Sequence, residues 1–156
     1  PYAAPEGSVT HHTLTLDRQE LSYSADANWL VLQTKDEKPA AEMFYIYYVA
    51  EKEPCDQRPI TFVFNGGPGA ASAYLHLGSL GPKRALFSPD GNNLPPPIRI
   101  VDNKESWLEF TDLVFVDPVG TGYSRVIPAR VRKEEGDGKD ALQEREKDIG
   151  FDTVQK

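Results

Sequence analysis

The stretch RPITFVFNGGPGAAS, from Arg58 to Ser72, decides the fold expected of this chain. Ile60 to Phe64 is a run of β-branched and aromatic residues, a composition typical of a buried strand. The run stops at Asn65-Gly-Gly-Pro-Gly69, and residues 71–80 supply Ala, Leu and Tyr without proline, which predicts a helix. A strand that runs through a glycine loop into a helix presents several backbone N–H groups at one point, and glycines let a substrate approach them closely.

The chemistry of this loop is narrowed by what it lacks. It has neither the Gly-Lys-Ser/Thr ending of a phosphate-binding loop nor the GxGxxG spacing of a dinucleotide site. A carbonyl oxygen that becomes an oxyanion is the better candidate, because hydrolases build that site from the loop after an early strand. The alternative interpretation, a tight turn without chemistry, stays open at this point.

Composition narrows the class of protein. With 156 residues the chain can form one domain with a core. The net charge of −7 and the pI of about 5.0 argue against nucleic acid as a partner, and no apolar run has the length of a membrane span. The single cysteine, Cys55, excludes an internal disulfide. His11 and His12 are adjacent on a predicted strand and face opposite ways, paired carboxylates do not stand out, and no metal or cofactor is predicted.

The N-terminal third predicts an antiparallel meander. Its strongest β segment is Met43 to Val49, which is nearly all aromatic or β-branched. Further strands are expected at Val9 to Leu16, Leu21 to Ser24 and Trp29 to Thr34, with residues 26–28 as the turn between the last two.

A second apolar strand follows the predicted helix, which ends at Gly81-Pro82. This strand, Leu113 to Val116, runs into another glycine loop, Gly120 to Ser124. A short strand at Ile98 to Val101 and a turn or short helix at Asn103 to Phe110 are expected before it. Two apolar strands that each end in a glycine loop predict neighbours in an α/β sheet, with their carboxyl ends at one site.

The chain is expected to be part of a larger fold. A parallel sheet needs helices over both faces, yet residues 71–80 form the one convincing helix, so both apolar strands would be left uncovered. There is no Gly-x-Ser-x-Gly nucleophile motif, and His76 on the predicted helix fits a core or rim position better than a general base. Residues 130–156, rich in charge, are expected to be a mobile segment or a short capped helix near a chain break.

Several motifs, taken in order, resemble the serine carboxypeptidases. They are Asn65-Gly-Gly-Pro-Gly69 with Ser72, Gly81-Pro82, Asn103, Ser106-Trp107, and Leu113-Val-Phe-Val-Asp-Pro-Val-Gly-Thr-Gly-Tyr-Ser124. The chain looks like the N-terminal part of a carboxypeptidase Y-like enzyme of the bacterial branch, over roughly residues 9–127. The resemblance implies an α/β-hydrolase fold, with residues 1–129 as its N-terminal part. It also implies that the catalytic Ser, Asp and His lie beyond this sequence.

The resemblance also assigns site residues. The amide of Gly67 matches the oxyanion-hole donor, and Asn65 with the amide of Gly66 matches the groups that bind the free C-terminal carboxylate of a peptide. Tyr74, Gly78 and Ser79 fall where the helix lines the pocket for the leaving residue.

Three positions depart from the family pattern. Ala70 replaces the usual cysteine of this loop, Val63 replaces a common tryptophan, and Ser79 stands where many members have a glutamate. The pocket preferences of other members are therefore not transferred. The loop from Gly120 to Ser124 is interpreted as structural support beside the site in preference to a substrate contact.

The expected function is hydrolysis of the last peptide bond of a free C-terminus by acyl-enzyme chemistry, with a second chain or segment supplying the triad. An acyltransferase of the same family, a non-catalytic binding module and, more distantly, an iminopeptidase-like hydrolase remain alternatives. The family and a start at Pro1 in place of Met favour an exported, processed protein.

Overall fold

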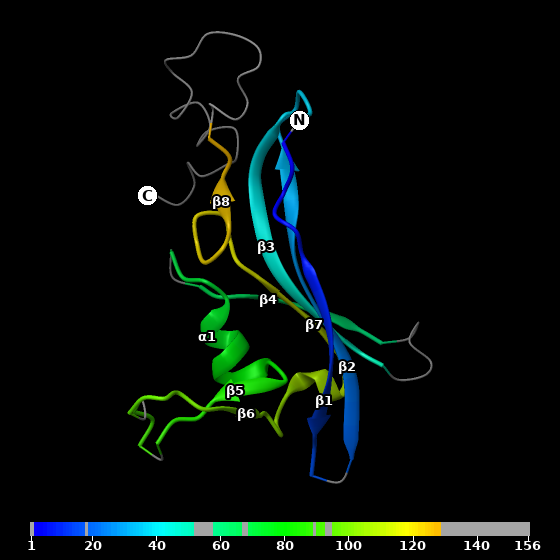
Figure 1. Cartoon of the computed structure of the whole chain (residues 1–156), viewed down its shortest axis with the longest axis vertical. Helices are drawn as coiled ribbons and strands as arrows, with labels where there is room; N and C mark the ends of the chain where they lie inside the picture. The colour runs from blue at the N-terminus through cyan, green and yellow to red at the C-terminus, as the bar shows by residue number, and fades with distance from the viewer. Residues whose placement is uncertain are drawn as a thin grey trace.

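The computed structural model describes residues 2–17, 19–51, 58–66, 69–88, 90–92 and 95–128. Cys55, Gly67 and the charged segment 130–156 lie outside the described residues, so the predicted boundary at residue 129 stays a prediction. The described part contains a six-stranded mixed sheet in the order β1-β2-β3-β7-β4, with β8 also paired to β3, and a separate β5-β6 pair. Figure 1 shows the helix α1 and the β5-β6 pair on one side of the large sheet.

The predicted antiparallel meander is confirmed in the first three strands. They are β1 (Ser8–Thr15), β2 (Glu20–Gln33) and β3 (Pro39–Ala50), each antiparallel to the next. The predicted turn at residues 26–28 is wrong, because β2 runs through it without a break. Asp26 pairs with Val9 on one side and Tyr47 on the other, and pairing on both sides overrides the turn preference of Asp and Asn.

The two apolar strands are neighbours, as the sequence predicts. β4 (Ile60–Phe64) and β7 (Asp112–Val116) run parallel, in register from Ile60 opposite Asp112 to Phe64 opposite Val116. β7 also pairs with β3, so it is central, whereas β4 is the last strand of the described sheet.

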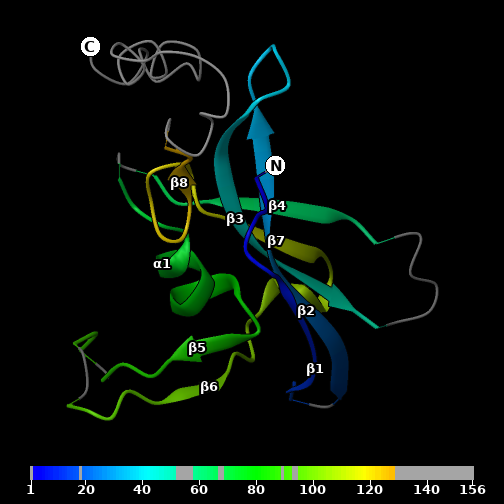
Figure 2. The same cartoon turned by 45° about the horizontal axis from the view of Figure 1, so that its top comes forward.

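The connection between β4 and β7 carries the remaining short elements. They are α1 (Ala73–Leu75), the π-helix η2 (His76–Leu80), β5 (Lys83–Ala85), β6 (Ile100–Asp102) and the 3₁₀ helix η3 (Trp107–Glu109). After β7, the chain turns back to form β8 (Arg125–Val126) against β3. Figure 2 shows α1 beside the sheet, near the end of β4 that leads into it.

One face of the sheet forms the core, and the helical segment covers it. Leu75 and Leu80 pack against the buried cluster, which consists of Leu14, Leu16, Leu21, Tyr23, Tyr48, Ala50, Val63, Leu108, Leu113 and Phe115. Residues Val63 and Phe115 lie opposite each other in the register of β4 and β7, so both strands contribute to this face.

The other face of β4 is open. Ile60, Phe62 and Phe64 are 51%, 62% and 56% exposed, which confirms that this strand is left uncovered. The same expectation for β7 is wrong, because all five of its residues are buried. Val114 lies between Tyr47 of β3 and Phe62 of β4 in register, and these larger side chains flank it on the uncovered face.

Candidate active site

The first glycine loop leaves its backbone accessible at the described positions. Asn65 follows β4 directly and is partly exposed, and its side-chain Nδ2 donates to the carbonyl of Gly66 at 3.2 Å. A Cβ placed on Gly66 would meet no atom within 4 Å, so a ligand has room to reach its amide. Gly69 adopts a left-handed conformation with φ of +92°, which favours glycine. Gly67, the predicted oxyanion donor, lies outside the described residues.

The three predicted pocket residues lie on the solvent side of the helical segment. Tyr74 is 75% exposed, and Gly78 and Ser79 are also exposed. Ser79 Oγ donates to the carbonyl of Leu75 at 3.3 Å. Tyr74 and Gly78 are four residues apart, the spacing of helix neighbours. The geometry therefore presents them outward, where a further segment or a substrate can contact them.

His76 is a partly buried residue of η2 that packs against the core. Its Nε2 lies 2.6 Å from the Tyr48 hydroxyl, and its ring packs on Phe115 with centroids 4.7 Å apart. Burial lowers the pKa of His76 to about 4, and the charge of Asp117 offsets part of that change. Burial raises the pKa of Tyr48, so its hydroxyl stays protonated and can donate to Nε2. These contacts favour a core or rim position over the role of a general base for His76.

The second glycine loop is tied to the framework at several points. Ser124 Oγ accepts from the amide of Phe44 and donates to the carbonyl of Asp117, both at 2.7 Å. The Asp117 carboxylate accepts from the amide and hydroxyl of Ser72 at 2.8 and 2.9 Å, and from the amide of Tyr123 at 3.2 Å. These bonds favour structural support as the role of this loop. Sequence reasoning missed Asp117, although an Asp directly after a buried strand could have drawn attention to it.

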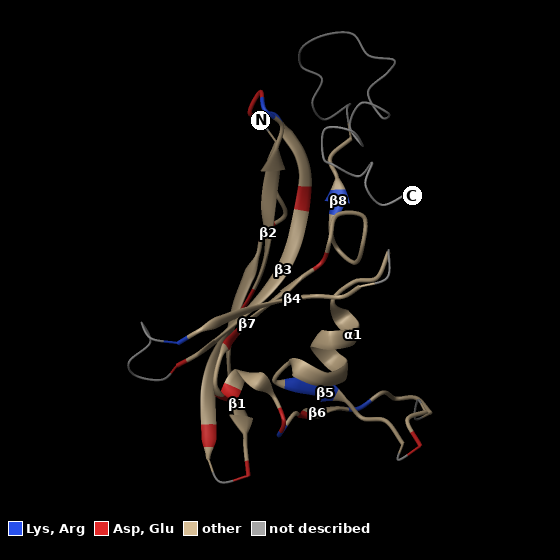
Figure 3. Ribbon diagram, turned by 180° about the vertical axis from the view of Figure 1, so that it is seen from behind, with Lys and Arg blue, Asp and Glu red and all other residues tan. Residues whose placement is uncertain are grey.

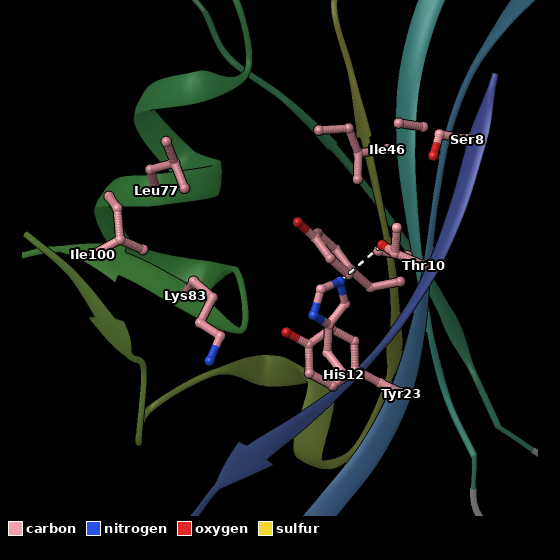
Figure 4. Close-up of a pocket in the computed structure, with 11 residues that line it drawn as sticks. Ser8, Thr10, His12, Tyr23, Ile46, Leu77, Lys83 and Ile100 are labelled. Carbon is pink, nitrogen blue, oxygen red and sulfur yellow. Dashed lines mark hydrogen bonds between the residues drawn. The ribbon is translucent and has the colours of Figure 1, made fainter. Parts of the chain in front are cut away.

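A cavity of about 360 Å³ opens between the meander and the β5-β6 pair (Figure 4). Its exposed surface is mainly apolar, and its polar side chains are those of Ser8, Thr10, His12, Tyr23, Tyr48 and Lys83. None of the described candidate residues lines it. His12 bonds Thr10 at 2.7 Å, whereas its neighbour His11 bonds Glu51 at 2.7 Å, so the two histidines have separate partners. No cluster of three metal-ligating side chains occurs among the described residues.

The candidate site is electrically neutral in its own elements. β4, α1 and η2 contain no Asp, Glu, Lys or Arg, and Figure 3 shows these ribbons without coloured residues. Binding at this loop by these elements would therefore depend on neutral hydrogen-bond donors.

No helix in the described ranges is long and apolar enough to cross a membrane.

Comparison with known proteins gives the family. The family model described as serine carboxypeptidase matches residues 19–144, so the chain belongs to the serine carboxypeptidase family. "Serine-type carboxypeptidase F" of Aspergillus niger is 36% identical over 94 residues, which is 60% of this chain and 16% of that protein. "Serine carboxypeptidase-like 44" of Arabidopsis thaliana is 33% identical over 114 residues, covering 69% of this chain and 21% of that protein.

A solved structure is also similar. The crystal structure of a prohormone-processing carboxypeptidase from Saccharomyces cerevisiae gives a TM-score of 0.46 at 26% identity, over 78% of this chain and 21% of that one. The chain spans about a fifth or less of the length of these relatives. They are fungal and plant proteins, and the bacterial branch stays a prediction.

Proposed function

We propose that this chain is the N-terminal portion of a serine carboxypeptidase that removes the last residue of a peptide through an acyl-enzyme. In this proposal Asn65 and the amide of Gly66 bind the C-terminal carboxylate, and the amide of Gly67 stabilises the oxyanion. The observation that carries the proposal is the open, uncharged backbone at Gly66, at the carboxyl end of a parallel strand. Membership of the family supports the same chemistry.

Neutral donors suit this substrate. A carboxypeptidase has to favour a terminal carboxylate over an internal peptide bond, and an amide side chain plus a backbone N–H can donate to both carboxylate oxygens. Tyr74, Gly78 and Ser79, exposed on the same segment, are proposed to line the pocket of the leaving residue.

The catalytic Ser, Asp and His are proposed to come from a further segment or a second chain that joins the sheet at β4. Within the described sheet β4 pairs only with β7, so its other edge can accept another strand. The exposed side chains of Ile60, Phe62 and Phe64 provide an apolar face for helices of that segment. A serine-reactive fluorophosphonate should label that segment and not residues 1–156. Export of the enzyme stays a prediction from the family.

The test is Asn65→Ala in the complete enzyme. Removing a hydrogen bond to a charged group costs about 1.5–3 kcal/mol, so KM for peptides with a free carboxylate should rise roughly 10- to 100-fold. KM for the matching C-terminal amides or esters should change much less, because they lack that charge.

A matched control is Asn92→Ala, which removes an exposed asparagine side chain whose Nδ2 bonds Asp90, outside the candidate site. It should leave KM unchanged for the free-carboxylate peptides and for the matching amides or esters. Equal losses on carboxylate and amide substrates in Asn65→Ala would contradict the clamp assignment.

A further inference from the structure

Both ends of the first glycine loop are attached to consecutive residues, the last residue of β7 and the one that follows it. The loop begins after Phe64, which pairs with Val116 at the end of β7. It ends at Ser72, whose amide and hydroxyl both donate to Oδ1 of Asp117, at 2.8 and 2.9 Å. The entry of the loop at Phe64 and its exit at Ser72 are therefore held by residues 116 and 117.

The Asp117 carboxylate is itself firmly held. Asp117 is 5% exposed, and its second oxygen, Oδ2, accepts from the amide of Tyr123 at 3.2 Å. Its backbone amide donates to the carbonyl of Phe44 at 3.0 Å, and its carbonyl accepts from Ser124 Oγ at 2.7 Å. Both carboxylate oxygens are engaged within the protein, so this group has no access to substrate.

The second glycine loop packs directly on this carboxylate. A Cβ on Gly122 would lie 1.9 Å from Asp117 Oδ2 and 3.1 Å from the Cβ of Ala71. Gly122 also has φ of +50°, in the left-handed region that favours glycine. The missing side chain at Gly122 thus lets the two loops meet around the Asp117 carboxylate.

We infer that Asp117 is a positioning residue that holds the exit of the first glycine loop at Ser72, and that through this attachment it supports the oxyanion donor and the carboxylate clamp assigned to the loop. This inference rests on the proposed function. An oxyanion donor acts only within a few tenths of an ångström of its ideal distance, and a displacement of 1 Å can cost about 10²-fold in rate. Because the carboxylate fixes the exit of the loop, its loss changes the rate without removing any group that touches substrate.

The test compares three variants of the complete enzyme. Asp117→Asn keeps the shape but places an NH₂ group against either the Ser72 donors or the Tyr123 amide. Gly122→Ala displaces the carboxylate from the opposite side. Gly120→Ala is the matched control, because Gly120 has φ of +88° in the same loop but a Cβ there meets nothing within 4 Å.

The concentration of active sites in each variant is measured by fluorophosphonate labelling carried to completion. Activity assays are run well below the melting temperature of each variant. Asp117→Asn and Gly122→Ala should lower kcat per labelled site about 10- to 100-fold, on esters and peptides alike, and should slow labelling similarly. Gly120→Ala should stay within about twofold of the wild type in kcat per labelled site. If Asp117→Asn does not fold, Ser72→Ala removes one donor and should give a smaller loss in the same direction.

The inference is overturned if kcat per labelled site stays within about twofold of wild type while the melting temperature falls, since Asp117 is then only structural. A wild-type enzyme that reacts with the fluorophosphonate but cleaves no free-carboxylate peptide would contradict the proposed function instead. The labelling rates of the variants would still test the positioning role in that case.

Discussion

The two glycine loops differ in how they use their glycines. In loop 65–71, a Cβ on Gly66 or Gly69 would meet open space, and Asn65 bonds only its neighbour, Gly66, among the described contacts. In the second loop, Gly122 has the Asp117 carboxylate where its Cβ would be. The same residue type thus provides access in one loop and close packing in the other.

The hydrogen bonds of the two glycine loops differ in the same way as their glycines. The second loop closes on itself through the Thr121 amide to Pro118 and the Ser124 amide to Thr121, at 3.0 and 2.9 Å. Its Ser124 hydroxyl then bridges to β3. A loop with its own bonds and a buried anchor can support a neighbour, whereas Gly66 in the first loop leaves room for a ligand at its backbone. Glycine content alone does not tell these roles apart.

The largest expected effect on stability is at Ser124. Ser124→Ala leaves the buried amide of Phe44 and the carbonyl of Asp117 without this partner, and should lower the free energy of unfolding by about 3–5 kcal/mol. Asn65→Ala in the other loop should lower it by less than about 0.5 kcal/mol. Urea unfolding of both variants measures the difference, and similar losses would remove the contrast between the loops.

The sequence predicts the framework of both loops better than their roles. Period-two and apolar runs locate the strands, because burial of one face imposes that pattern, and the parallel pairing of β4 with β7 followed from their shared character. The continuous β2 was missed, since a turn preference at Asp26 is local and its partners on β1 and β3 are not. The contact of Asp117 with Ser72 joins residues 45 positions apart, and no local pattern encodes it.

A smaller effect on stability is expected from the titration of His76, which lies in η2, the helical segment that follows the first loop. Its pKa is about 4 in the fold against 6.5 in an unfolded chain, so the unfolded state takes up the proton first. The contribution of this group to stability is fully present above pH 6.5 and falls as the pH drops toward 4, by about 3 kcal/mol.

His76→Gln can still accept from the Tyr48 hydroxyl but cannot titrate. Unfolding curves at several pH values should show a loss between pH 6.5 and pH 4 that is smaller by about this amount in the variant. If both proteins showed the same pH dependence, the side chain of His76 would be more exposed to solvent than its contacts with Tyr48 and Phe115 indicate.

The smallest change in stability is expected at Gly66. Gly66→Ala adds a Cβ that meets no atom within 4 Å, at a residue outside the left-handed region, so the free energy of unfolding should stay within about 0.5 kcal/mol. The new methyl group would nevertheless lie beside the amide proposed to bind the substrate carboxylate, and KM for free-carboxylate peptides should rise roughly 10-fold. Gly122→Ala is the opposite case, because its Cβ enters an occupied space and stability should fall with activity. A stability loss at Gly66 as large as that at Gly122 would show that the first loop is packed and not open, and the access on which the carboxylate clamp depends would then be absent.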